Sequence, residues 1–197
     1  MSLVYDDILF SRLGKNFIEV INHLSNLTLE EFIFLNYSPN THSEHECKYF
    51  INENADIIDG IRTQIEEWSL SSKVEKKEYI LVIIVLVESV SLYSNIPGTY
   101  GAFNKKWDPR SVRKSQIFNG IVNNKFSKTN HKTYNTDLRH IIGDVECDVL
   151  YLDPPYTEDD YSMYYHVLET ISLFYNPILN DNKTGTKKLY KKSEWCN

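Results

Sequence analysis

The residues best suited to chemistry lie in the stretch 148–156, where an apolar run ends in an acid, two prolines and a tyrosine. Residues 148–152 are apolar almost throughout, a pattern typical of a strand buried on both faces of a parallel sheet. Pro154 and Pro155 cannot continue a strand ladder and fix the backbone twice, so a stiff turn should follow. Asp153 would then stand at the carboxyl end of a strand, where open α/β sheets bind their ligands.

That turn suits a planar group that bears an exocyclic amino group. The Asp153 carboxylate and the Pro154 carbonyl would accept the two amino hydrogens while the ring stacks on Tyr156. The other interpretation of these residues is a surface turn, in which the acid caps the next helix and the tyrosine packs on it.

The motif Asp153-Pro154-Pro155-Tyr156 resembles the catalytic motif of the amino-group DNA methyltransferases. The longer run 148–171 is similar to the site of the adenine-specific, Dam-like D12 class, and so are three further segments, 95–110, 133–142 and, more weakly, 49–68. This resemblance implies transfer of a methyl group from S-adenosylmethionine to adenine N6 in DNA, without a metal. The adenine would leave the base stack, because its amino group is inaccessible in the duplex.

The resemblance also implies positions for the cofactor and the DNA. It places S-adenosylmethionine near Asp7, whose neighbour Asp6 is the alternative, and near Asp137. Helix capping is the other interpretation of these acids. The loop 95–101 would be either a lid with Tyr100 stacking on a base or a plain connector. Further DNA contacts are expected from Tyr161, Tyr165 and His166.

The basic residues are concentrated in one segment, although the formal net charge of the chain is −6. Residues 101–132 contain eight Lys and Arg against one acid, whereas residues 1–100 contain seven against fifteen. Such a run is either a solvated face or a phosphate-binding surface, and the interleaved Phe103 and Trp107 favour nucleic acid. We therefore expect double-stranded DNA as a partner. The expected contacts are Lys105, Lys106, Arg110, Arg113 and Lys114.

The fold expected is α/β, an incomplete Rossmann-like methyltransferase sheet that carries a mainly helical insertion. The core would comprise residues 1–37 and 132–179, and the insertion 38–131 would occupy the place of the family's target-recognition region, with a flexible tail at 180–197. Thr28 would form a capping box with Glu31, three residues on. Strands are expected near 3–6, 132–135 and 148–152, and helices over 8–24, 28–35, 53–70, 73–93 and 161–175.

One part of the family pattern has no counterpart. The family's first motif, an aromatic-x-Gly-x-Gly loop for the cofactor, is missing, since the seven glycines form no Gly-x-Gly. The sequence therefore indicates a methyltransferase truncated at its amino end, with reduced or no activity alone. Three alternatives stay open: an inactive remnant, one half of a split enzyme completed by a second chain, and a non-enzymatic DNA-binding module. A protein glutamine as substrate would share the turn chemistry but would not explain the basic segment.

Cysteine usage and hydropathy indicate the compartment of the protein and whether it spans a membrane or binds a metal. Three widely spaced cysteines favour a reduced, cytoplasmic protein. The apolar run 79–87 is too short to cross a bilayer and is interpreted as a buried helix. Around His42, His45 and Cys47, a polar loop is favoured over a zinc site, so no metal and no membrane partner are expected.

Overall fold

Helices dominate the computed structural model, which describes residues 9–39, 47–113, 132–153 and 161–180. Two short strands pair as an antiparallel hairpin near its amino end. The described elements are β1 (Leu9–Phe10), β2 (Lys15–Asn16), α1 (Phe17–Leu24), α2 (Phe32–Tyr37), α3 (Asn52–Leu70), α4 (Lys76–Tyr93), the 3-10 helix η2 (Leu138–His140) and α5 (Ser162–Leu173).

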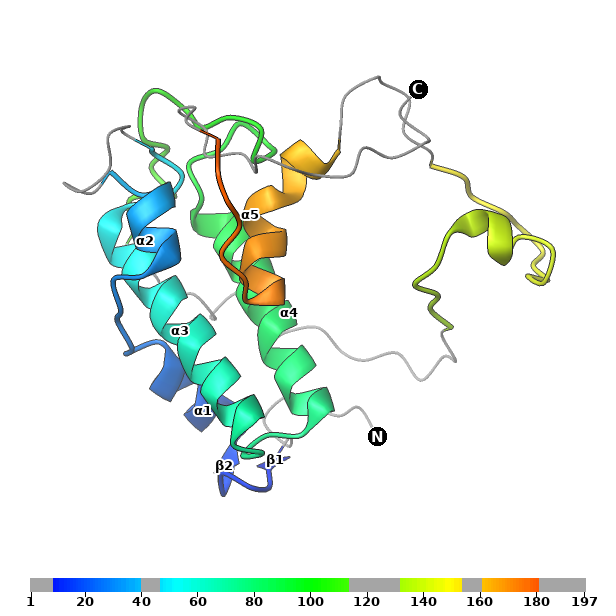
Figure 1. Cartoon of the computed structure of the whole chain (residues 1–197), viewed down its shortest axis with the longest axis horizontal. Coiled ribbons are helices and arrows are strands. Elements are labelled where there is room, and N and C mark those ends of the chain that lie inside the picture. Colours follow the sequence, from blue (N-terminus) through cyan, green and yellow to red (C-terminus); the bar gives the residue numbers. More distant parts are fainter. Residues whose placement is uncertain (1–8, 40–46, 114–131, 154–160, 181–197) are drawn as a thin grey trace.

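The helices pack around α3, which contacts α1, α2 and α4, while α5 lies against α4 (Figure 1). The predicted helices over 53–70, 73–93 and 161–175 are confirmed, with ends shifted by a few residues. Each buries one apolar side, because residues three and four apart share a helix face. The side chains buried most completely include Phe17, Leu24, Ile58, Ile61, Ile65, Leu86, Val90, Val167 and Ile171.

The amphipathic run 79–87 lies within α4 and is only half buried. Val82, Val85 and Leu86 face the core, whereas Ile80 is 44% and Ile84 52% exposed. Among the described residues, the model contains no helix with the length and apolar composition needed for a membrane span.

The helix predicted over residues 8–24 is correct only in its second half. The described residues before Asn16 form the β1–β2 hairpin, and Gly14 takes the left-handed conformation at φ +62° that this turn requires. Asn16 then begins α1 with a capping box: its side chain accepts from the Glu19 amide at 2.9 Å, and the Glu19 carboxylate accepts from the Asn16 amide at 2.8 Å. The spacing Asn-x-x-Glu is typical of a helix start at this position. The apolar residues before it also have helical spacing, and for that reason the predicted helix began too early.

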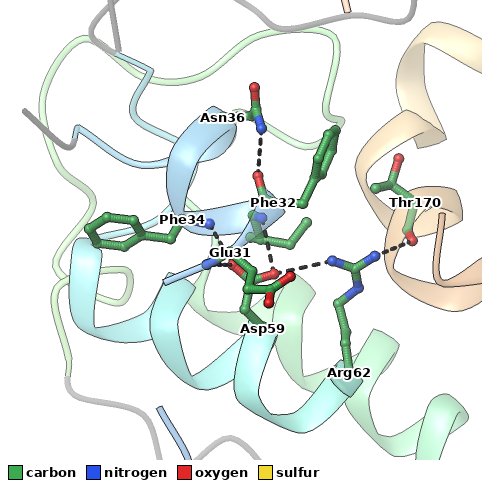
Figure 2. A network of polar contacts seen from close by, with 8 residues as sticks. Glu31, Phe32, Phe34, Asn36, Asp59, Arg62 and Thr170 are labelled. Carbon is green, nitrogen blue, oxygen red and sulfur yellow. Dashed lines mark hydrogen bonds and ion pairs between the residues drawn. The ribbon is translucent and has the colours of Figure 1, made fainter. Parts of the chain in front are cut away.

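The predicted helix 28–35 with a Thr28 cap is wrong. The helix is α2, it begins at Phe32, and its orphan amide groups are capped from another helix (Figure 2). Asp59 of α3 accepts hydrogen bonds from the amides of Glu31 at 3.1 Å, Ile33 at 3.0 Å and Phe34 at 2.8 Å. A carboxylate supplied by tertiary packing thus replaces the local cap.

Arg62 extends this polar network from α3 to α5 (Figure 2). Its guanidinium donates to Asp59 at 3.1 Å and to the Thr170 carbonyl at 3.1 Å, and it lies 5.1 Å from the centre of the Phe174 ring. Asp59 and Arg62 are 1% and 3% exposed. Burial raises the pKa of Asp59, against the opposing effect of its amide donors and Arg62, and burial lowers the pKa of Arg62. The pair locks α2, α3 and α5 into one unit.

The expected strands at 132–135 and 148–152 are not formed. Residues 132–153 are irregular apart from η2, and they stand away from the helices (Figure 1). Val149 and Tyr151 are each 84% exposed, and Leu150 and Leu152 are each 56% exposed. A parallel strand needs ladder partners and cover on both faces, and the described residues supply neither. The strand expected near 3–6 lies outside the described residues.

Candidate DNA-binding and catalytic site

The motif expected to be catalytic begins at Asp153, an exposed residue at the end of the irregular segment 132–153. Pro154, Pro155 and Tyr156 lie outside the described residues, so their expected roles stay predictions. The chain is described again from Tyr161, where α5 begins one residue later.

Asp137 holds the amino end of η2, which agrees with the capping interpretation. Its carboxylate accepts from the Arg139 amide at 2.9 Å and from the Arg139 guanidinium at 3.0 and 2.7 Å. These donors hold the pKa of Asp137 well below its usual range. Asp7, the other expected cofactor residue, lies outside the described residues. Of the two expected cofactor residues, the structure therefore describes Asp137 alone, and its role stays a prediction.

Asn95 fixes the loop that carries the basic residues. It is fully buried, and its side chain donates to the carbonyls of Lys48 and Asn104, each at 3.0 Å, and accepts from the Asp108 amide at 2.9 Å. Its own amide donates to the Tyr49 carbonyl at 2.8 Å. One side chain thus closes the loop between 95 and 108 and attaches it to the segment before α3.

A second anchor joins the same loop to α5. The Tyr100 amide donates to the Tyr164 carbonyl at 3.1 Å, and the Tyr49 hydroxyl donates to the Tyr100 carbonyl at 2.6 Å. Gly101 allows this approach, because a Cβ at that position would lie 2.9 Å from Cδ1 of the Tyr164 ring. The loop expected at 95–101 is confirmed as irregular, and it is rigidly held.

Tyr100 is itself a core residue, which corrects the prediction that it stacks on a base. It is 2% exposed and its ring lies 5.7 Å from the Tyr49 ring and 6.4 Å from the Phe50 ring. Burial raises the pKa of Tyr100 to about 12. His166 is corrected for the same reason: it is 1% exposed and its ring packs 5.7 Å from that of Tyr37. Both rings are therefore packed in the core.

The basic side chains of the loop are exposed, as expected. Lys105, Lys106, Arg110 and Arg113 are all exposed, whereas Lys114 lies outside the described residues. Arg110 is oriented by Asp108, whose carboxylate accepts from Nε at 3.2 Å and from Nη2 at 3.1 Å. Arg110 holds the pKa of Asp108 below its ordinary value. The backbone of this stretch is fixed further on by Asn54, which donates to the carbonyls of Ser111 and Arg113.

A pocket of about 390 Å³ lies between the loop and α5. Its lining includes three of the expected DNA contacts, Tyr100, Arg110 and Tyr165, of which Tyr165 is 54% exposed. Tyr161 lies beside the pocket residue Tyr164, with ring centres 5.8 Å apart. Part of the remaining lining comes from the loop 95–101, which the sequence predicted as a lid or a connector. Ser91, Tyr164 and Leu168 were missed, since no local pattern links the end of α4 to α5. The additional lining residues include Ser91, Ile96, Pro97, Thr99, Tyr164 and Leu168.

Metal binding finds no support among the described residues, where no cluster of His, Cys, Asp and Glu could hold an ion. Cys47 is 3% exposed, and burial raises the pKa of its thiol to about 12. A thiol in that environment stays protonated and is a poor metal ligand. His42 and His45 lie outside the described residues.

Comparison with known proteins finds methyltransferases among the relatives of this chain. The chain is 39% identical over 194 residues to the type II methyltransferase M.FokI of Planomicrobium okeanokoites, covering 95% of this chain and 29% of that protein. It is 37% identical over 157 residues to the modification methylase LlaI of Lactococcus lactis subsp. lactis, covering 79% and 24%. It is 30% identical over 179 residues to the type II methyltransferase M.NlaIII of Neisseria lactamica, covering 90% and 52%.

The chain thus spans between about a quarter and a half of the length of these relatives. No solved structure matches it. The family model for D12 class N6 adenine-specific DNA methyltransferases matches residues 11–194, which include the basic loop, the pocket and the motif at 153–156. This chain belongs to the D12 class of N6 adenine-specific DNA methyltransferases.

Proposed function

We propose that this chain takes part in transferring a methyl group from S-adenosylmethionine to N6 of adenine in double-stranded DNA. The observation that carries the proposal is the family match over 11–194, within which Asp153-Pro154-Pro155-Tyr156 stands in full. The relatives named as type II methyltransferases and modification methylases support a restriction-modification context.

The motif residues would act on the amino group of an adenine swung out of the duplex. Asp153 and the Pro154 carbonyl would accept the two amino hydrogens, which directs the nitrogen lone pair toward the methyl donor. Pro155 would stiffen the turn and Tyr156 would stack on the base, a contact worth about 1–3 kcal/mol. Swinging the base out costs a few kcal/mol, which contacts of this kind offset.

S-adenosylmethionine would supply the methyl group. Asp7 and Asp137 are the proposed contacts to it. Because the Asp137 carboxylate accepts three hydrogen bonds from Arg139 in the structure, a cofactor contact requires that ion pair to open or to be shared.

The family implies an α/β fold, and we propose an incomplete Rossmann-like sheet for this chain. Residues 148–152 would become its catalytic strand when neighbouring strands cover them, since four apolar side chains there are at least 56% exposed. The segments 3–6 and 132–135, and further sequence from this or a second chain, are the proposed neighbours. Residues 38–131 would then serve target recognition between the two parts of the core, 1–37 and 132–179.

The experiment that tests this function measures transfer of labelled methyl groups from S-adenosylmethionine to adenine-containing duplexes. The wild-type chain should label DNA, and Asp153→Ala should abolish the labelling because alanine offers no acceptor for the amino hydrogens. Asp144→Ala is the matched control, an exposed acid in the same irregular segment 132–153. Equal labelling by wild type and Asp153→Ala would exclude the proposed role of the motif.

A second candidate function is a DNA-binding part that depends on a partner for catalysis. The exposed segment 148–152 favours it, because a catalytic strand without neighbours cannot hold the motif in place. This function predicts salt-dependent duplex binding that survives Asp153→Ala, with methyl transfer only after a complementing chain is added.

A further inference from the structure

The pocket between the loop and α5 has the properties of a ligand site. Its volume of about 390 Å³ falls in the range of about 300–1,000 Å³ typical of small-molecule sites. Its two sides are joined by the hydrogen bond from the Tyr100 amide to the Tyr164 carbonyl and by the contact of Gly101 with the Tyr164 ring. The cavity is therefore built into the packing of the loop on the helix.

The lining chemistry suits an unpaired nucleotide. Tyr165 presents an exposed aromatic face, and Pro97 and Leu168 add apolar surface, a combination on which any base can stack. Thr99 brings a hydroxyl group to the lining, and the Ser91 hydroxyl, which donates to the Val87 carbonyl at 3.2 Å, can still accept. None of the described residues that line the pocket is an Asp or a Glu, and Asp153 is not among them. The described lining thus lacks the carboxylate with which the proposed methyl-accepting site would hold adenine.

Arg110 could bind the phosphate of a nucleotide held in the pocket. Asp108 engages Nε and Nη2 of Arg110, and this orients the guanidinium while Nη1 stays available among the described contacts. Arg110 also belongs to the pocket lining. Lys105, Lys106 and Arg113 are exposed on the same loop, so the phosphates on either side of a bound nucleotide would meet positive charge.

We propose that this pocket binds one unpaired nucleotide of the DNA other than the methylated adenine, with the base on Tyr165 and its phosphate on Arg110. Flipping or unpairing one base exposes its partner and neighbours, and a pocket that takes such a base stabilises the opened duplex. The inference rests on the proposed DNA-methylating function for the identity of the nucleic acid. Because the described lining contains no carboxylate that would select one base, the pocket should accept any of the four bases.

The test uses a single-stranded DNA hexanucleotide with 2-aminopurine at its centre, whose emission reports stacking, titrated into the full chain. Tyr165→Leu should weaken binding about tenfold, and Tyr165→Phe should restore it because the ring returns. Arg110→Gln should weaken binding and reduce its salt dependence. Thr99→Trp, which fills the pocket without changing charge, should block the emission change. Leu173→Ala is the control, since Leu173 is an exposed apolar residue of α5 outside the pocket.

Two results would overturn the assignment. One is unchanged affinity in both Tyr165→Leu and Thr99→Trp. The other is loss of S-adenosylhomocysteine binding, measured by calorimetry, in these two variants while the oligonucleotide binds as before, because the pocket would then hold the adenosyl group of the cofactor. The binding measurement does not require methyl transfer. If the chain transfers no methyl group but still binds the oligonucleotide more weakly in Tyr165→Leu, the proposed catalysis is contradicted and the pocket assignment is supported.

Discussion

The Asp108 amide donates a hydrogen bond to Asn95 Oδ1 at 2.9 Å, and this contact joins the two ends of the loop that carries the basic side chains. The same Asn95 side chain donates to two carbonyls, those of Lys48 and Asn104. The position of the positive charges thus depends on one fully buried amide. A loop held in this way presents its cations in a fixed geometry and loses little further entropy on binding.

Asn95→Ala should destabilise the chain by about 2–4 kcal/mol, since it leaves two part-buried carbonyls and one amide without their partner. Urea unfolding followed by circular dichroism measures the change. Asn104→Ala is the control: in the described contacts Asn104 is bonded through its backbone, and the expected loss is below about 0.5 kcal/mol. Similar losses in the two variants would contradict the clamp.

Gly60→Ala should destabilise the chain although alanine is the better helix former. A Cβ at position 60 would lie 3.0 Å from the Leu27 carbonyl carbon, the Leu27 Cβ and the Thr28 nitrogen. Overpacking of this kind costs about 1–3 kcal/mol, against about 1 kcal/mol gained in helix propensity. Gly143→Ala, where an added Cβ meets nothing within 4 Å, is the control and should be neutral. A higher unfolding temperature for Gly60→Ala than for wild type would contradict this prediction, because the backbone at 27–28 would then have moved to make room for the Cβ.

Arg62→Met should cost about 3–5 kcal/mol, because it leaves the buried Asp59 carboxylate without its charged partner. The double change Asp59→Asn with Arg62→Met should cost less than the sum of the single changes, as a double-mutant cycle by urea unfolding would show. Glu75→Gln, which breaks the exposed pair with Lys77, should change stability by less than about 1 kcal/mol. Additive single effects at Asp59 and Arg62 would contradict the coupled network.

Stability between pH 4 and 6 should depend on Asp56. Burial and the nearby carboxylates of Glu30, Asp59 and Glu53 raise the pKa of Asp56 to about 6. The folded state therefore takes up a proton that the unfolded state does not, so this group's contribution becomes more favourable as pH falls from 6 to 4. Asp56→Asn should be more stable than wild type at pH 7, by less than about 1 kcal/mol given its solvent exposure. The difference should vanish near pH 4, and a pH-independent difference would exclude this cause.

The helices could be predicted because their signals are local. The apolar spacing within 53–70 and 73–93 places α3 and α4 within a few residues. The start of α2 could not be predicted, because its cap is Asp59, which is more than twenty residues further along the chain. The hairpin before Asn16 was missed because apolar residues fell by chance at helical spacing through Gly14.

The sequence predicted which types of residue the site contains, but it predicted less well which of them are exposed. The exposed Lys105, Lys106 and Arg113 agree with the expectation from composition. Tyr100 and His166 have the same chemistry as surface aromatics, but long-range packing against Tyr49 and Tyr37 takes them into the core. The strand expected at 148–152 needs neighbours that the described residues do not provide, and a sequence pattern shows only that a segment suits a sheet interior.

Both proposed functions require the loop 101–113 to hold duplex DNA, so the salt dependence of duplex binding tests the account most directly. The variant with Lys105, Lys106 and Arg113 all changed to Gln should bind more weakly, and the slope of log K against log salt should fall by about 2–3, near 0.9 per lost phosphate contact. The matched control changes Lys73, Lys76 and Lys77 to Gln, three exposed lysines before and at the start of α4, and should keep the wild-type slope. Equal slopes for the two triple variants would contradict the assignment of this loop to DNA.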